Sequence, residues 1–76
     1  MKLQIYDDIE AERRRQDEEW GIQTHSPVAW FTILVEEVGE VAKALLSESP
    51  SEWRRELVQV AAVVVATLEA YEEPTK

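Results

Sequence analysis

The sequence contains no cysteine, so no disulfide bond can support the fold. This matters because a chain of 76 residues buries only about 60% of the surface that its unfolded form exposes. Such short chains usually rely on disulfides, a structural metal or association with other chains. We therefore expect a bound metal, an oligomer or both. The lack of cysteine also fits a reducing compartment, and we place the protein in the cytoplasm.

Long hydrophobic runs and basic residues are also scarce. No segment reaches the roughly 18 to 20 apolar residues of a membrane span, and the first residues lack the apolar stretch of a secretory signal. We therefore predict a soluble protein. Eight Lys and Arg residues stand against 16 Asp and Glu residues, which leaves a formal net charge of −8. This charge argues against binding to a nucleic-acid polymer or an anionic membrane, but local cations and a divalent metal can still hold one triphosphate.

Two Ser-Pro dipeptides mark the starts of two helices. Ser26-Pro27 and Ser49-Pro50 each place a favourable N-cap before a proline at the first helical position. They predict one helix from Pro27 to about Ser47 and another from Pro50 that ends before Pro74. Glu52, three residues after Ser49, is in place to close a capping box.

A further helix is expected from about Leu3 to Trp20, with Gly21 ending it in a left-handed conformation. Its apolar stripe is modest and its exposed side is broad. The predicted fold class is therefore all-α, with three helices per chain that form an oligomeric helical bundle. Residues 1–76 are expected to be one domain.

The third helix supplies the argument for an oligomer. Between Leu57 and Leu68 only Gln59 and Thr67 are not apolar, so this segment should be buried on nearly every side. Three short helices cannot bury it so completely, and we expect a second subunit to pack there in a dimer or tetramer. The run Val63–Val65 would also suit a buried strand. We favour the helix because a cap precedes the run and no second strand is available to pair with it.

Three glutamates interrupt the otherwise apolar second helix. Glu36 and Glu40 are four residues apart and Glu37 and Glu40 three apart, so their charges share a face and repel. They form either a solvated acidic stripe or a cation site.

The predicted hairpin brings a second acidic segment to the same level. Glu40 and Glu56 both lie roughly 10 Å from the turn, and Glu37 and Gln59 roughly 14 to 15 Å from it. Four oxygen-bearing side chains thus form two facing pairs across the hairpin, Glu40 with Glu56 and Glu37 with Gln59. Oxygen ligands without histidine or cysteine suit Mg²⁺, or Mn²⁺, better than Zn²⁺.

These residues carry a resemblance to a known family. Glu36-Glu37-Val38-Gly39-Glu40 is followed, after fifteen residues, by Glu56-Leu57-Val58-Gln59. The pattern resembles the E-E-x-x-E and E-x-x-D motifs of the MazG-like all-α nucleoside triphosphate pyrophosphohydrolases. The stretch at 12–21 and the run at 56–62 are similar to short phage-type or actinobacterial members, so the resemblance covers nearly the whole chain.

The resemblance implies an enzyme that splits a nucleoside triphosphate into monophosphate and pyrophosphate. It implies Mg²⁺ bound by Glu37, Glu40 and Glu56, with Glu36 or Glu37 orienting the attacking water and the site near a subunit interface. Gln59 departs from the motif, because the family has Asp there. Either the site works with one charge fewer, or the chain is a non-catalytic nucleotide-binding or helical interaction module with a degenerate metal site.

Other residues are candidates for contacts with the rest of the nucleotide. Phosphate-binding candidates are Lys43, Arg54 and Arg55, although each also fits ordinary surface ion pairing. Within Arg13–Arg15 most of the charge is expected to be solvated, with one arginine available to phosphate.

Nucleobase-binding candidates are His25, Trp20 and Trp30, which lie near one another in the sequence. The alternatives are core packing for Trp30 and a helix-end anchor for Trp20. The sequence does not identify the nucleotide.

Overall fold

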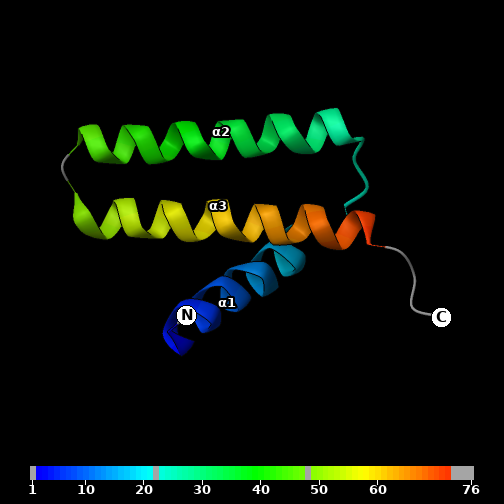
Figure 1. The fold of residues 1–76 in the computed structure, drawn as a ribbon, viewed down its shortest axis with the longest axis horizontal. Coiled ribbons are helices and arrows are strands. Elements are labelled where there is room, and N and C mark those ends of the chain that lie inside the picture. The colour runs from blue at the N-terminus through cyan, green and yellow to red at the C-terminus, as the bar shows by residue number, and fades with distance from the viewer. Residues whose placement is uncertain (1, 22, 48, 73–76) are drawn as a thin grey trace.

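The described residues form three helices in the order α1 (Leu3–Trp20), α2 (Pro27–Leu46) and α3 (Pro50–Tyr71) (Figure 1). The computed structural model describes residues 2–21, 23–47 and 49–72. Helices α2 and α3 run antiparallel, side by side, as a hairpin, and α1 crosses α3 obliquely (Figure 1). Helix α3 packs against both of the others. The all-α prediction is confirmed, and no strand occurs in the described ranges.

Local caps explain the helix boundaries. The Oγ of Ser26 accepts a hydrogen bond from the backbone N–H of Ala29 at 3.2 Å, and the Oγ of Ser49 accepts one from Glu52 at 3.4 Å. Gly21 follows α1 with a φ of 70°, which glycine adopts without strain. The two serine caps and the positive φ of Gly21 are confirmed, but a ψ of −162° places Gly21 outside the left-handed helical region. The return bond of the capping box, from the Ser49 N–H to the Glu52 side chain, does not form within the described part of the chain.

The C-terminal ends of α2 and α3 lie close to their expected positions. Helix α2 ends at Leu46, one residue before Ser47, whose hydroxyl instead donates to the carbonyl of Ala44 at 2.7 Å. Helix α3 ends at Tyr71. Pro74, which was expected to limit it, lies outside the described residues. The strand alternative for residues 63–65 is wrong, because this run lies inside α3.

The hydrophobic core of a single chain is small. Its buried apolar residues within the described ranges are Trp30, Ala44, Ala62 and Val63. The predicted burial of the 57–68 segment is therefore incomplete, because Val64 is 38% and Leu68 66% exposed. The radius of gyration is 13.3 Å, whereas a compact chain of this length has about 11 Å.

Two ion pairs connect α1 to α3. Asp8 pairs with Arg54 at 2.7 Å, and Arg13 pairs with Glu69 at 2.8 Å. The only buried residue of α1 is a glutamine, Gln16. The prediction of a broad exposed side on this helix is confirmed.

Candidate metal and nucleotide site

Glu37 lies on the core-facing side of α2. It comes seven residues after Trp30 and seven before Ala44, the two buried residues of this helix. Seven residues are close to two helical turns, so the three side chains project in nearly the same direction. Its side chain is half-buried. A carboxylate in line with the core residues is unusual, because burial of a charge must be compensated.

Helix α3 presents Glu56 and Gln59 to this carboxylate. Glu56 precedes the buried Val63 by seven residues, and Gln59 precedes it by four. The amide of Gln59 has its nitrogen toward the acids, since the opposite orientation would place oxygen against oxygen. In this orientation Nε2 donates to Glu56 Oε2 at 2.9 Å and to Glu37 Oε2 at 3.2 Å. The predicted pairing of Glu37 with Gln59 across the hairpin is confirmed.

The environment of Glu37 disfavours its negative charge. Partial burial raises the pKa of the Glu37 carboxyl above its ordinary value, and repulsion from Glu56 and then Glu40 adds to the effect. Glu12 and Glu36 contribute in the same sense. A divalent cation placed among these groups would remove the repulsion.

The complete set of predicted ligands is not assembled. Glu36 and Glu40 are exposed, and no hydrogen bond within the described chain connects Glu40 to Glu56 across the hairpin. Within residues 2–21, 23–47 and 49–72, no three acidic or histidine side chains are grouped closely enough to hold a metal ion. Two carboxylates bridged by an amide form the part that is in place.

Sequence reasoning missed one acidic residue of this cluster. Glu12 of α1 is only 12% exposed at its side chain and lies near enough to Glu37 to affect its pKa. It continues the spacing of Ile5 and Ile9 along the helix, where a third apolar residue is expected. This break in the apolar pattern could have identified Glu12. It was not recognised, because the adjacent arginines explain an acidic residue there as an ordinary ion-pair partner.

The predicted phosphate-binding residues lie at different places. Arg54 is two residues from Glu56 and so faces another direction, where its Nη2 donates to Asp8. That bond is the main reason why the pKa of Asp8 is lowered. Lys43 and Arg55 are exposed and form no ion pair within the described ranges.

The predicted nucleobase residues lie around one end of the hairpin. The rings of His25 and Trp30 meet edge to face with centroids 4.9 Å apart. The Nε2 of His25 is 2.8 Å from the Gln23 side-chain oxygen, and the Tyr71 hydroxyl donates to the His25 carbonyl. Trp30 is buried, so it packs in the core, whereas Trp20 is half exposed at the end of α1.

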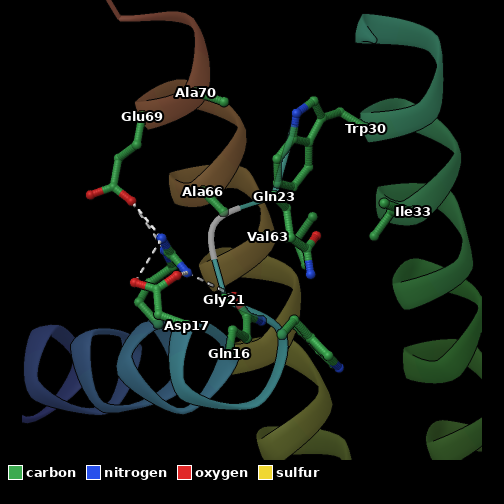
Figure 2. Close-up of a pocket in the computed structure, with 12 residues that line it drawn as sticks. Gln16, Asp17, Gly21, Gln23, Trp30, Ile33, Val63, Ala66, Glu69 and Ala70 are labelled. Atoms are coloured by element: carbon green, nitrogen blue, oxygen red, sulfur yellow. Dashed lines mark hydrogen bonds and ion pairs between the residues drawn. The ribbon is translucent and has the colours of Figure 1, made fainter. Parts of the chain in front are cut away.

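A cavity of about 400 Å³ lies among the three helices and is lined by two of these aromatic residues, Trp20 and Trp30 (Figure 2). Trp30 and Ile33 form its α2 wall, Val63 and Ala66 lie on α3, and Trp20 lines it from α1. The acidic cluster lies one or two helical turns from this cavity, on the same faces of α2 and α3. Glu37 follows Ile33 by four residues, and Gln59 precedes Val63 by four. The cavity and the acidic cluster are therefore neighbours along the hairpin.

No protein-family model, curated protein or solved structure matches this chain. The observations that bear on its function are therefore its residues and their geometry. None of the three helices, as far as they are described, has the length and apolar character needed to cross a membrane.

Proposed function

We propose that this protein is a Mg²⁺-dependent nucleoside triphosphate pyrophosphohydrolase that converts a nucleoside triphosphate into the monophosphate and pyrophosphate. One observation carries the proposal: the Gln59 amide bridges Glu37 and Glu56, so the two halves of the E-E-x-x-E and E-x-x-Q pattern meet across the hairpin. The cavity beside them is of a size that accepts part of a small ligand.

The chemistry of the donors fits a magnesium ion. Glu37, Glu56 and the carbonyl oxygen of Gln59 would hold it, and the exposed Glu40 is close enough in sequence to join them. All are oxygen ligands, and after partial burial, repulsion from Glu56 and Glu40 also raises the pKa of Glu37. When bound, Mg²⁺ would neutralise phosphate charge and promote attack at phosphorus. For Gln59 to contribute its oxygen, its amide must turn over.

The reaction needs a water molecule to attack the α-phosphorus. A bond forms between the water oxygen and this phosphorus, and the bond to the oxygen bridging the α- and β-phosphates breaks, so that pyrophosphate leaves. We assign the orientation of the water, and acceptance of its proton, to Glu36 or Glu37. We also assign contact with phosphate to Lys43, because it follows Glu40 by three residues.

The direct test is a panel of canonical and modified deoxynucleoside triphosphates incubated with the pure protein and Mg²⁺. We expect at least one to yield monophosphate and pyrophosphate in equal amounts, and we expect EDTA to stop the reaction. Release of inorganic phosphate would identify a different reaction. Inactivity across the panel would contradict the proposal.

The same amide bridge also favours a second candidate function. Because Gln59 donates to two carboxylates without a metal, the cluster also fits a purely structural polar layer. In that case the chain would be a nucleotide-binding or helical interaction module without turnover. Binding of a nucleotide without hydrolysis, together with activity gained on Gln59→Asp, would identify this alternative.

We further propose that the protein is a homo-oligomer. Helices α2 and α3 form a groove of about 310 Å³ lined by Phe31, Leu34, Val64, Leu68 and Tyr71. Phe31 is 65% and Leu68 66% exposed, which is costly for a chain with so small a core. A second copy covering this face would supply the burial that one chain lacks.

Replacing Leu68 by glutamate should weaken the oligomer, because a charge would be buried without a partner. We expect light scattering to show an oligomer for the wild type, and the dissociation constant to rise at least about tenfold in Leu68→Glu. Leu3, which is 78% exposed on α1, provides the matched control, and Leu3→Glu should leave the mass unchanged. A monomeric wild-type protein would refute the proposal.

A further inference from the structure

Three consecutive arginines on α1 have three different environments. Arg13 is the most buried, with 17% of its side chain exposed. Its Nε and Nη2 donate to Glu69, its Nη1 to Gln16, and both terminal nitrogens to Asp17. All five N–H groups of the guanidinium are therefore in use. Arg13 is a structural connection between α1 and α3, and it has no donor left for a ligand.

Arg14 faces solvent. Its side chain is 72% exposed, and it pairs with Glu10, which is 65% exposed. Successive residues on a helix project about 100° apart, so Arg14 lies on a different side of α1 from either neighbour. Such an exposed pair contributes little to stability.

Arg15 lies on the side of α1 that carries Glu12. Its Nε and Nη2 donate to the two oxygens of Glu12 at 3.0 and 2.6 Å, and its Nη1 donates to Glu19. The guanidinium carbon is also 5.7 Å from the centre of the Trp20 ring. Arg15 thus contacts Glu12, whose charge acts on Glu37, and Trp20, which lines the cavity, although Arg15 itself does not line it.

We propose that Arg15 is a phosphate-binding residue of the site, in contact with the triphosphate between the metal and the nucleoside. The inference rests on the proposed function. The two neighbours of Arg15 point to the two ends of such a ligand, because Glu12 acts on Glu37, where the phosphates would bind, and Trp20 lines the cavity, where the nucleoside would bind. This arginine is 48% exposed, so a ligand can reach it.

The hydrogen bonds of Arg15 leave capacity for a phosphate. Three of its five N–H groups are used, and two remain on the terminal nitrogens. Exchange of Glu19, which is 53% exposed, for a phosphate oxygen would free a third. The two bonds to Glu12 can persist during this exchange, so the guanidinium stays oriented. Its planar shape suits bidentate contact with phosphate.

The test is calorimetric titration of the full chain, in Mg²⁺, with the α,β-methylene analogues of the four canonical deoxynucleoside triphosphates. These analogues resist cleavage at the bond in question. We expect Arg15→Gln to weaken the tightest analogue about 10- to 100-fold, as loss of charge-assisted hydrogen bonds implies. Arg15→Lys should be intermediate. Binding of the matching nucleoside, which lacks phosphates, should not change.

Arg14→Gln is the matched control, because it removes the same charge from the adjacent position and should bind like the wild type. Equal affinities for Arg14→Gln and Arg15→Gln, with a wild type that binds, would overturn the assignment of Arg15 alone. A wild-type protein that binds none of the analogues would overturn the proposed function as well. Weaker binding of the nucleoside in Arg15→Gln would instead assign a structural role to Arg15.

Discussion

Glu37→Gln is expected to raise the melting temperature of the metal-free protein by a few degrees and to remove both the response to Mg²⁺ and catalysis. The two effects have one cause, because Glu37 is a carboxylate in line with the core residues of α2 and surrounded by other acids. Glutamine keeps the shape and removes the charge. The loss of turnover should exceed about 100-fold, since even residues that only support a metal ligand cost 10- to 100-fold.

The pH dependence of this stability gain follows from the direction of the pKa shift. The pKa of Glu37 is raised in the folded protein from an ordinary value of 4.5. A raised carboxyl pKa favours folding at low pH, and this contribution is lost as the pH rises from 4.5 through the raised pKa. The difference in melting temperature between Glu37→Gln and the wild type should therefore grow over that interval. Scanning calorimetry at several pH values without metal measures it.

Glu40→Gln separates the effect on catalysis from the effect on metal-free stability, which Glu37→Gln combines. Glu40 is exposed, so its replacement should abolish turnover with little gain in metal-free stability, and the helices and the oligomer should remain intact. If Glu37→Gln left the melting temperature and the Mg²⁺ response unchanged, the acidic cluster would not be a cation site. Full activity of Glu40→Gln would instead mean that the metal lies elsewhere.

Gln59→Asp should have opposite effects on the metal-free and metal-bound forms. Without metal, the substitution removes the amide donor that serves Glu37 and Glu56 and adds a third carboxylate beside them. The melting temperature should fall. With Mg²⁺, the additional charge should strengthen binding by about tenfold or more, and turnover should rise. Calorimetry with and without Mg²⁺ measures both changes, because a ligand of the folded state raises its stability.

Asparagine at the same position is the matched control, since it has the shape of aspartate without its charge. Gln59→Asn should lose the bridge and some stability, but it should gain no affinity for Mg²⁺. Equal Mg²⁺ responses in the Asp and Asn variants would show that Gln59 does not face a metal. The comparison also distinguishes an enzyme with one charge fewer from a module whose metal site has degenerated.

Local signals were sufficient to predict the helices. The caps at Ser26 and Ser49 and the glycine at 21 act within one turn of the chain, so residues adjacent in sequence determine them. The register of the hairpin was also predictable, because a short turn and a fixed rise per residue place Glu37 opposite Gln59. The 63–65 run remained ambiguous, because valine suits both a helix interior and a strand.

The candidate site was predicted only in part. The carboxylates at 37 and 56 and the amide at 59 were found from spacing, whereas Glu12 was not, because nothing in the sequence states where α1 packs. That position depends on pairs 46 and 56 residues apart, Asp8 with Arg54 and Arg13 with Glu69. The whole of α2 lies between the partners in the sequence, and no local pattern relates them.

The sequence by itself thus determined the three helices, their limits and the line of oxygen donors along the hairpin, since these depend on interactions within a few residues or across one short turn. The tertiary structure alone decided what each polar side chain contacts. It made Gln59 a donor to two carboxylates and brought Glu12 near enough to act on the pKa of Glu37. It also gave three adjacent arginines separate environments, because a helix directs successive side chains to different sides and only the packing of α1 against α3 determines what each side meets.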